Sequence, residues 1–187
     1  HRDAITQYCR VIRQSGAEPV FYEMGWGTTE REAEGRKRLM KLTQENDIKI
    51  YVPCSTAWAR VRAERPDLKL QHPKDGTHPG DLGHFLNLAC FYSAFVQQSP
   101  EGRLPRDYHV WPHLTKDEKT RLNEQLETAF ANFRPDAYQA KLPEWMRRNA
   151  GAGYRGSLAE DDAKYLERVA WETWSLVSKQ LTRPPSD

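Results

Sequence analysis

The spacing of apolar residues alternates along the first hundred residues between a helical period and short continuous runs. The helical period predicts helices over residues 3–15, 29–46, 55–64 and 85–92. Runs of β-favouring residues predict strands at 19–24 and 48–53. Strands that alternate with helices are typical of βαβ units, in which the strands are parallel and helices cover both faces of the sheet. The pattern therefore predicts a three-layer α/β fold.

Residues typical of helix caps and helix stops stand at several of the predicted helix ends. Gly16 follows the first helix and is predicted to be its C-cap. Asn46-Asp47 is interpreted as the stop of the second helix. Ser55 and Asp81 stand where the next two helices begin, and each is interpreted as an N-cap.

Ligands of open parallel sheets bind at the carboxyl ends of the strands. In a regular sheet, this rule brings Met24 to Gly27, Cys54 to Thr56 and the loop around Asp75 to one rim. These three segments are therefore expected to line one cleft.

Beyond residue 100 the pattern is mainly helical. Residues 104–112 are predicted to form a connector, and residues 143–156 are predicted to be irregular. Between them, a helical stripe starts from a capping-box spacing at 115–118 and runs to Pro135. The same spacing recurs at 157–160, before a last stripe of Leu166, Val169, Ala170, Thr173, Val177 and Leu181. We divide the chain into an α/β part, residues 1–100, and a helical extension, 101–187, that packs on it.

Composition narrows the class of protein. The 187 residues are 38% hydrophobic and 29% charged, which suits one α/β domain with an appendage. A net charge of +2 gives no strong field for nucleic acid, and no apolar run is long enough to predict a membrane span. Three cysteines are too few for a disulfide framework and are predicted to be core thiols: Cys9, Cys54 and Cys90.

The segment from His72 to His84 carries the candidate chemistry. Asp75 precedes His78 by three residues in a loop that contains glycine and proline. A carboxylate at this spacing can accept the Nδ1 proton of the imidazole and leave Nε2 as a general base. Because the next helix begins a few residues later, its positive end is expected to keep the imidazole neutral.

The sequence Asp75-Gly76-Thr77-His78-Pro79, followed by Leu82-Gly83 and a helix of small and aromatic residues, resembles the last conserved block of SGNH/GDSL hydrolases. The preceding order of helix, strand, Trp-containing loop, Glu-rich helix and strand is similar to the same family. The resemblance covers residues 1–100 and, weakly, the final helix. It implies a flavodoxin-like parallel sheet and a Ser-His-Asp triad, with His78 as the base and Asp75 orienting it.

The chain departs from the family in what it lacks. The Gly-Asp-Ser nucleophile block, the second-block glycine and the Gly-x-Asn-Asp block do not occur in the sequence. Ser55 follows a strand but lacks a nucleophile-elbow context. The chain begins with His1 inside a helical pattern, so we expect the serine and the N-terminal part of the sheet to lie upstream of residue 1. We therefore expect the isolated chain to be inactive.

The resemblance implies a carboxylic ester substrate, including acetyl esters of carbohydrates, and neither a metal nor an organic cofactor. Trp26 is the candidate wall of the substrate cleft, whereas Trp58 is interpreted as a buried core residue. By analogy with bacterial members, a secreted or periplasmic location is expected.

Two other classes of function stay open. Histidine and aspartate side chains alternate at every third position of one segment and are potential ligands of Zn²⁺ in a metallohydrolase. They are His72, Asp75, His78, Asp81 and His84. Alternatively, the chain is a noncatalytic interaction module, in which the helical extension binds a partner or forms a dimer.

Overall fold

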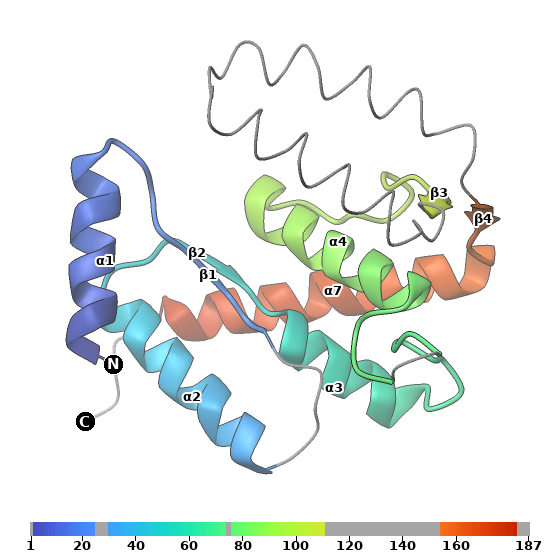
Figure 1. The fold of residues 1–187 in the computed structure, drawn as a ribbon, viewed down its shortest axis with the longest axis horizontal. Coiled ribbons are helices and arrows are strands. Elements are labelled where there is room, and N and C mark those ends of the chain that lie inside the picture. The colour runs from blue at the N-terminus through green and yellow to red at the C-terminus, as the bar shows by residue number, and fades with distance from the viewer. Residues whose placement is uncertain (1, 25–29, 74–75, 111–153, 183–187) are drawn as a thin grey trace, which may run out of the picture. The chain divides into compact units, whose positions relative to one another are not determined.

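A computed structural model of the chain describes residues 2–24, 30–73, 76–110 and 154–182 (Figure 1). Two compact units are distinguished by their internal contacts. The first comprises residues 1–104 and 159–187, and the second comprises residues 105–158. The division of the chain at residue 100 stays a prediction, but the last helix belongs to the same unit as the first hundred residues.

Six helices and strands of the first unit follow the predicted alternation in chain order. They are α1 (Arg2–Gln14), β1 (Val20–Tyr22), α2 (Glu30–Glu45), β2 (Ile50–Val52), α3 (Cys54–Glu64) and α4 (Asp81–Val96). β1 and β2 pair in parallel, with Val20 opposite Ile50 and Tyr22 opposite Val52. The described residues thus contain one parallel pair joined through a helix, which agrees with a βαβ unit and does not by itself define a flavodoxin-like sheet.

Backbone bonds end the first two helices where the sequence indicates. After α1, Gly16 takes a positive φ of 80° and donates to Arg13, while Ala17 donates to the Ile12 carbonyl. After α2, Asp47 has a φ of 51° and donates to Gln44, while Ile48 donates to Thr43. Both patterns are Schellman motifs, so the two predicted helix stops are confirmed.

Three N-cap interpretations are wrong. α3 begins at Cys54, one residue before Ser55, and its N-cap position is Pro53. α4 begins at Asp81 itself, with Gly80 at the N-cap and no side-chain capping bond. Ser157 ends a strand, and the last helix begins at Glu160. The capping spacing at Thr29 lies outside the described residues.

The core of the first unit lies between the parallel pair and helices α3, α4 and α7 (Glu160–Leu181). Figure 1 shows α7 running beside α3 and α4. The predicted stripe of α7 is buried at Leu166, Val169, Ala170, Thr173 and Val177, and its last member, Leu181, is half-buried. α7 packs on α3 and α4, whose buried residues include Trp58, Val61, Leu86 and Ala89. Apolar burial on this scale is the main source of stability of such a unit.

The described part of the second unit is a pair of antiparallel strands, β3 (Asp107–Val110) and β4 (Tyr154–Ser157). These strands correct two sequence predictions, because β3 lies in the predicted connector and β4 overlaps the predicted irregular segment. Each strand is only four residues long and finds its partner more than forty residues away. The local pattern therefore contains no signal for either. The helix predicted from 115 to Pro135 lies outside the described residues.

Candidate functional site

The loop between α3 and α4 is a short hairpin. The amide of Gly80 donates to the Leu70 carbonyl at 2.7 Å, and the amide of His72 donates to the His78 carbonyl at 2.7 Å. Gln71 and Pro79 form an isolated antiparallel bridge between these bonds. Near the tip, Gly76 has a φ of 63°, which favours glycine. These bonds fix the backbone of His78 against its opposite arm.

The base of the hairpin is packed closely against α3 and α4. A Cβ atom on Gly83 would lie 2.3 Å from the Leu70 carbonyl oxygen and 2.6 Å from the Trp58 ring. Trp58 is buried, and its Nε1 donates to Asn87 Oδ1 of α4 at 2.8 Å. Gly83 thus packs closely against both the Leu70 carbonyl and the Trp58 ring, and Trp58 is in turn bonded to α4 through Asn87. The interpretation of Trp58 as a core residue is confirmed.

The three histidines of this region, two on the hairpin and His84 on α4, differ in exposure. His78 and His84 are exposed, whereas His72 is half-buried. Asp75 and Trp26 lie outside the described residues, so the predicted contact between Asp75 and His78 stays a prediction. An exposed imidazole on a fixed backbone is chemically suited to take a proton from a group supplied by another segment or by a substrate.

The metal alternative gains no support from the described residues. Among them, no three His, Cys, Asp or Glu side chains gather in a way that could hold a metal ion. The fourth and fifth members of the sequence cluster, Asp81 and His84, are both exposed on the first turn of α4. One potential ligand, Asp75, lies outside this part of the chain.

The cysteines do not offer an alternative nucleophile. Cys9, Cys54 and Cys90 are free and buried, which confirms the prediction of core thiols. A hydrogen bond with Cys90, together with burial, raises the pKa of the Cys54 thiol. A raised pKa keeps the sulfur protonated, whereas a nucleophilic cysteine needs a thiolate.

A buried carboxylate stands at the carboxyl end of β1. Glu23 is 1% exposed and accepts hydrogen bonds from the Tyr51 hydroxyl at 2.7 Å, the Thr56 amide at 2.8 Å and the Thr56 hydroxyl at 3.0 Å. Burial raises the pKa of Tyr51, and the neighbouring Glu23 charge raises it further. Glu23, the residue that follows β1, therefore satisfies an amide in the first turn of α3, a role assigned to Ser55 from the sequence.

This contact joins the end of β1 to the start of α3. Glu23, directly before Met24, bonds to Thr56, so the ends of β1 and β2 meet at the start of α3. Of the predicted rim segment Met24 to Gly27, residues 25–27 lie outside the described residues, so the predicted cleft stays a prediction. The role of Glu23 was missed from the sequence, although a lone carboxylate within the apolar run Val20 to Met24 was a usable signal.

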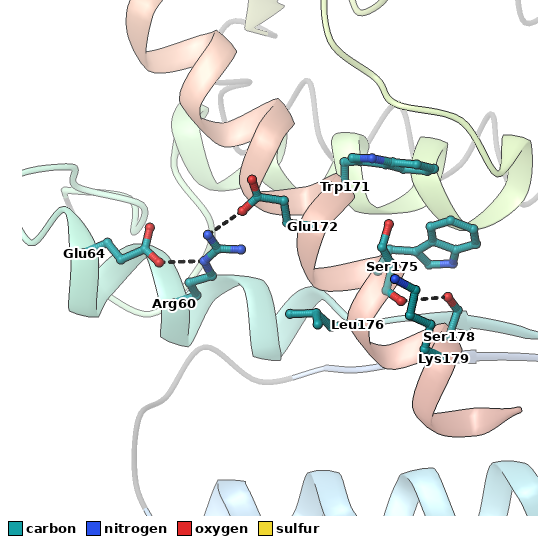
Figure 2. Close-up of a pocket in the computed structure, with 9 residues that line it drawn as sticks. Arg60, Glu64, Trp171, Glu172, Ser175, Leu176, Ser178 and Lys179 are labelled. Atoms are coloured by element: carbon teal, nitrogen blue, oxygen red, sulfur yellow. Dashed lines mark hydrogen bonds and ion pairs between the residues drawn. The ribbon is translucent and has the colours of Figure 1, made fainter. Parts of the chain in front are cut away.

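A second polar cluster links α3 to α7 and has no sequence signature. Arg60 donates to Glu64 at 2.6 Å and to Glu172 at 2.5 Å (Figure 2). Burial opposes the charge of Arg60, but the bonds to both carboxylates outweigh burial and raise its pKa. Arg60 and Glu172 are 112 residues apart in the sequence, so only the fold brings them together.

Compared with known protein families, with curated proteins and with solved structures, the chain matches none. Among the helices that the structure describes, none is long and apolar enough to cross a membrane.

Proposed function

We propose that this chain supplies the histidine and the aspartate of a serine esterase of the SGNH/GDSL type. In this proposal His78 is the general base, Asp75 orients it, and the serine lies in sequence upstream of residue 1. The serine attacks the ester carbonyl after His78 takes its proton, and the acyl-enzyme is then hydrolysed. The observation that carries the proposal is the exposed His78 side chain on a hairpin fixed by backbone bonds.

The parallel pair supports a larger sheet in the parent protein. Parallel sheets occur almost only with both faces covered and with several strands. In the described residues β1 pairs with β2 alone, and Val20 on β1 is 39% exposed. We propose that further strands of a flavodoxin-like sheet pair with β1 and carry the serine and the oxyanion hole.

The substrate class follows from the same proposal. The substrate is a carboxylic ester, including acetyl esters of carbohydrates, with Trp26 as a wall of the cleft. No metal or organic cofactor is required by the proposed triad, and a secreted or periplasmic location accompanies it. The isolated 187-residue chain lacks the nucleophile and is expected to be inactive.

Hydrolysis of p-nitrophenyl acetate by the parent open reading frame tests this function. The parent protein should be active, and His78→Ala should lower kcat by at least about a thousandfold, because triad members act as a unit. His84→Ala is the matched control, since His84 is also an exposed histidine, six residues further along the chain.

Three results would overturn the proposal. The first is a His78→Ala variant with wild-type kcat. The second is activity that EDTA abolishes, which would favour the metallohydrolase alternative. A parent protein with no esterase activity and no effect of His78 on any function would favour the interaction module.

A further inference from the structure

Two adjoining hollows lie along α7. The first, about 870 Å³, lies between α7 and α3 and is lined by Arg60, Glu64, Trp171, Glu172, Trp174 and Lys179, with neighbouring α7 residues. The second, about 710 Å³, shares Trp174, Ser178 and Lys179 with the first and continues toward α2 and β2. Volumes of this order suit ligand sites. We call the two hollows together the α7 groove.

Aromatic surface forms the apolar part of the α7 groove. The rings of Trp171 and Trp174 stack with their centroids 5.1 Å apart and their planes 28° apart. Leu176, at 59% exposed, also lines the first hollow. In Figure 2 Trp171 lies on the same side of α7 as Ser175 and Lys179. A tryptophan pair placed in an open hollow offers flat apolar faces beside polar groups.

The charges of the α7 groove are balanced. Arg60 is bound by both Glu64 and Glu172, and these two carboxylates offset the positive charges of Arg60 and Lys179. In the second hollow, Lys49 forms an ion pair with Asp47. Because no single sign of charge dominates, the groove is a poor match for a phosphate or another strongly anionic ligand, which requires unpaired cations.

The other uncharged polar groups of the lining include hydroxyls and amides, and the second hollow is also lined by Ile48, Tyr51, Ala94 and Leu181. Ser175 and Ser178 contribute to the first hollow, and Thr43, Gln44, Gln97 and Thr182 to the second. A neutral polyhydroxylated ligand matches this set, because its C–H faces can stack on indole rings while its hydroxyls bond to carboxylates, guanidinium and hydroxyls. The two adjoining hollows suit an extended ligand of several sugar units.

We propose that the α7 groove binds a neutral oligosaccharide, with Trp171 and Trp174 as its stacking platform and the Arg60–Glu64–Glu172 cluster as its hydroxyl partner. None of the lining residues belongs to the His78 hairpin, residues 70–80. The groove is therefore an additional binding site, and its occupancy does not depend on the proposed esterase triad.

Calorimetric titration of the 187-residue chain with cellohexaose, mannohexaose and chitohexaose tests the proposal, with oligogalacturonate as the anionic probe. At least one neutral hexasaccharide should bind, and Trp174→Ala should weaken that binding about tenfold, equivalent to roughly 1.4 kcal/mol. Ser175→Trp, which fills the middle of the groove, should weaken it without removing a core residue. Tyr8→Ala is the matched control, because Tyr8 is an exposed aromatic residue on α1.

Circular dichroism first establishes that each protein is folded. Failure of all three neutral hexasaccharides to bind the folded wild-type chain would overturn the proposal, and so would binding of oligogalacturonate alone. Unchanged affinity in folded Ser175→Trp would also overturn it. The His78→Ala variant should bind the saccharide with wild-type affinity. Failure of the esterase proposal would therefore not overturn the saccharide proposal.

Discussion

Gly83 allows the close packing of α4 against Leu70, at the base of the His78 hairpin. It lies in the first turn of α4, where a Cβ atom would approach the Leu70 carbonyl oxygen to 2.3 Å and the Trp58 ring to 2.6 Å. The backbone and a fully buried indole cannot move aside without disturbing the core. In the sequence Gly83 stands out only within the stretch that resembles a conserved block, whereas the structure gives the steric reason for a glycine at this position.

Gly83→Ala is expected to lower the free energy of unfolding by about 1–3 kcal/mol, because it overpacks this contact. Gly35→Ala is the matched control. Gly35 is also a helical glycine, on α2, and no described atom lies within 4 Å of its added Cβ. That variant should be about 1 kcal/mol more stable than the wild type, from helix propensity alone. Urea unfolding of both variants checks the prediction, and equal changes in the two would contradict it.

Tyr22 gives the fold a predicted sensitivity to alkali. Burial, and then the nearby Cys54 and Cys90, raise the pKa of Tyr22 to about 12, from an ordinary value of 10.0. Below pH 10 the phenol is neutral in both the folded and the unfolded chain. Between pH 10 and about 12 the unfolded chain ionises while the folded chain does not, so this contribution to stability is lost as the pH rises.

Tyr22→Phe removes the ionisable group and keeps the ring that lies 5.0 Å from Phe91. The free energy of unfolding of the wild type should therefore fall more steeply than that of the variant between pH 10 and 12. Urea unfolding at pH 9 and at pH 11.5 measures the difference. Parallel losses in the two proteins would show that Tyr22 titrates alike in the folded and unfolded states.

At the scale of elements, Glu23 joins β1, β2 and α3. Its carboxylate accepts bonds from Tyr51 on β2 and from the backbone and side chain of Thr56 on α3. Hydrogen bonds to a buried charged acceptor are stronger than neutral ones, and their loss leaves buried donors without partners. The start of α3 is therefore held by a residue more than thirty positions earlier in the chain.

Glu23→Met keeps a side chain of similar length and removes the acceptor. The free energy of unfolding should fall by about 3 kcal/mol, because the Tyr51 hydroxyl and the Thr56 amide lose their partner. Glu18→Met is the control, since the Glu18 side chain is 63% exposed and lies 4.0 Å from Arg13. It should change stability by less than about 0.5 kcal/mol. A Glu23→Met variant as stable as the control would show that the network contributes little.

The elements also show what the sequence could and could not predict. Periodic stripes and helix stops are local, so α1, α2, α4 and α7 were predicted to within a few residues. Strands β3 and β4 were missed because each is short and gains its partner from a distant segment. The caps were assigned to local Ser and Asp residues, whereas α3 is capped by Glu23 from another element. The ion pairs of Arg60 depend on the packing of α7 against α3, which no local pattern encodes.

At the scale of the whole molecule, the chain crosses between its two units twice, near residues 104 and 159. Asp107 pairs with Ser157, and the Leu158 amide donates to the Arg106 carbonyl at 3.1 Å, so the two crossing segments run side by side. Opposite residues in such a pair lie about 5 Å apart. A short linker can therefore replace the whole second unit without stretching the first.

The first unit is expected to fold without the second. Its core of α3, α4, α7 and the parallel pair lies within residues 1–104 and 159–187, and Glu167 on α7 accepts the Gly102 amide at 3.1 Å within the same unit. Replacing residues 105–158 by a Gly-Ser linker of about four residues should preserve helical circular dichroism and a single cooperative urea transition. A variant that is soluble but lacks a cooperative transition would mean that residues 105–158 complete the core. Retained cooperativity would show that α7 folds with the first hundred residues as one unit, across the insertion that separates them in sequence.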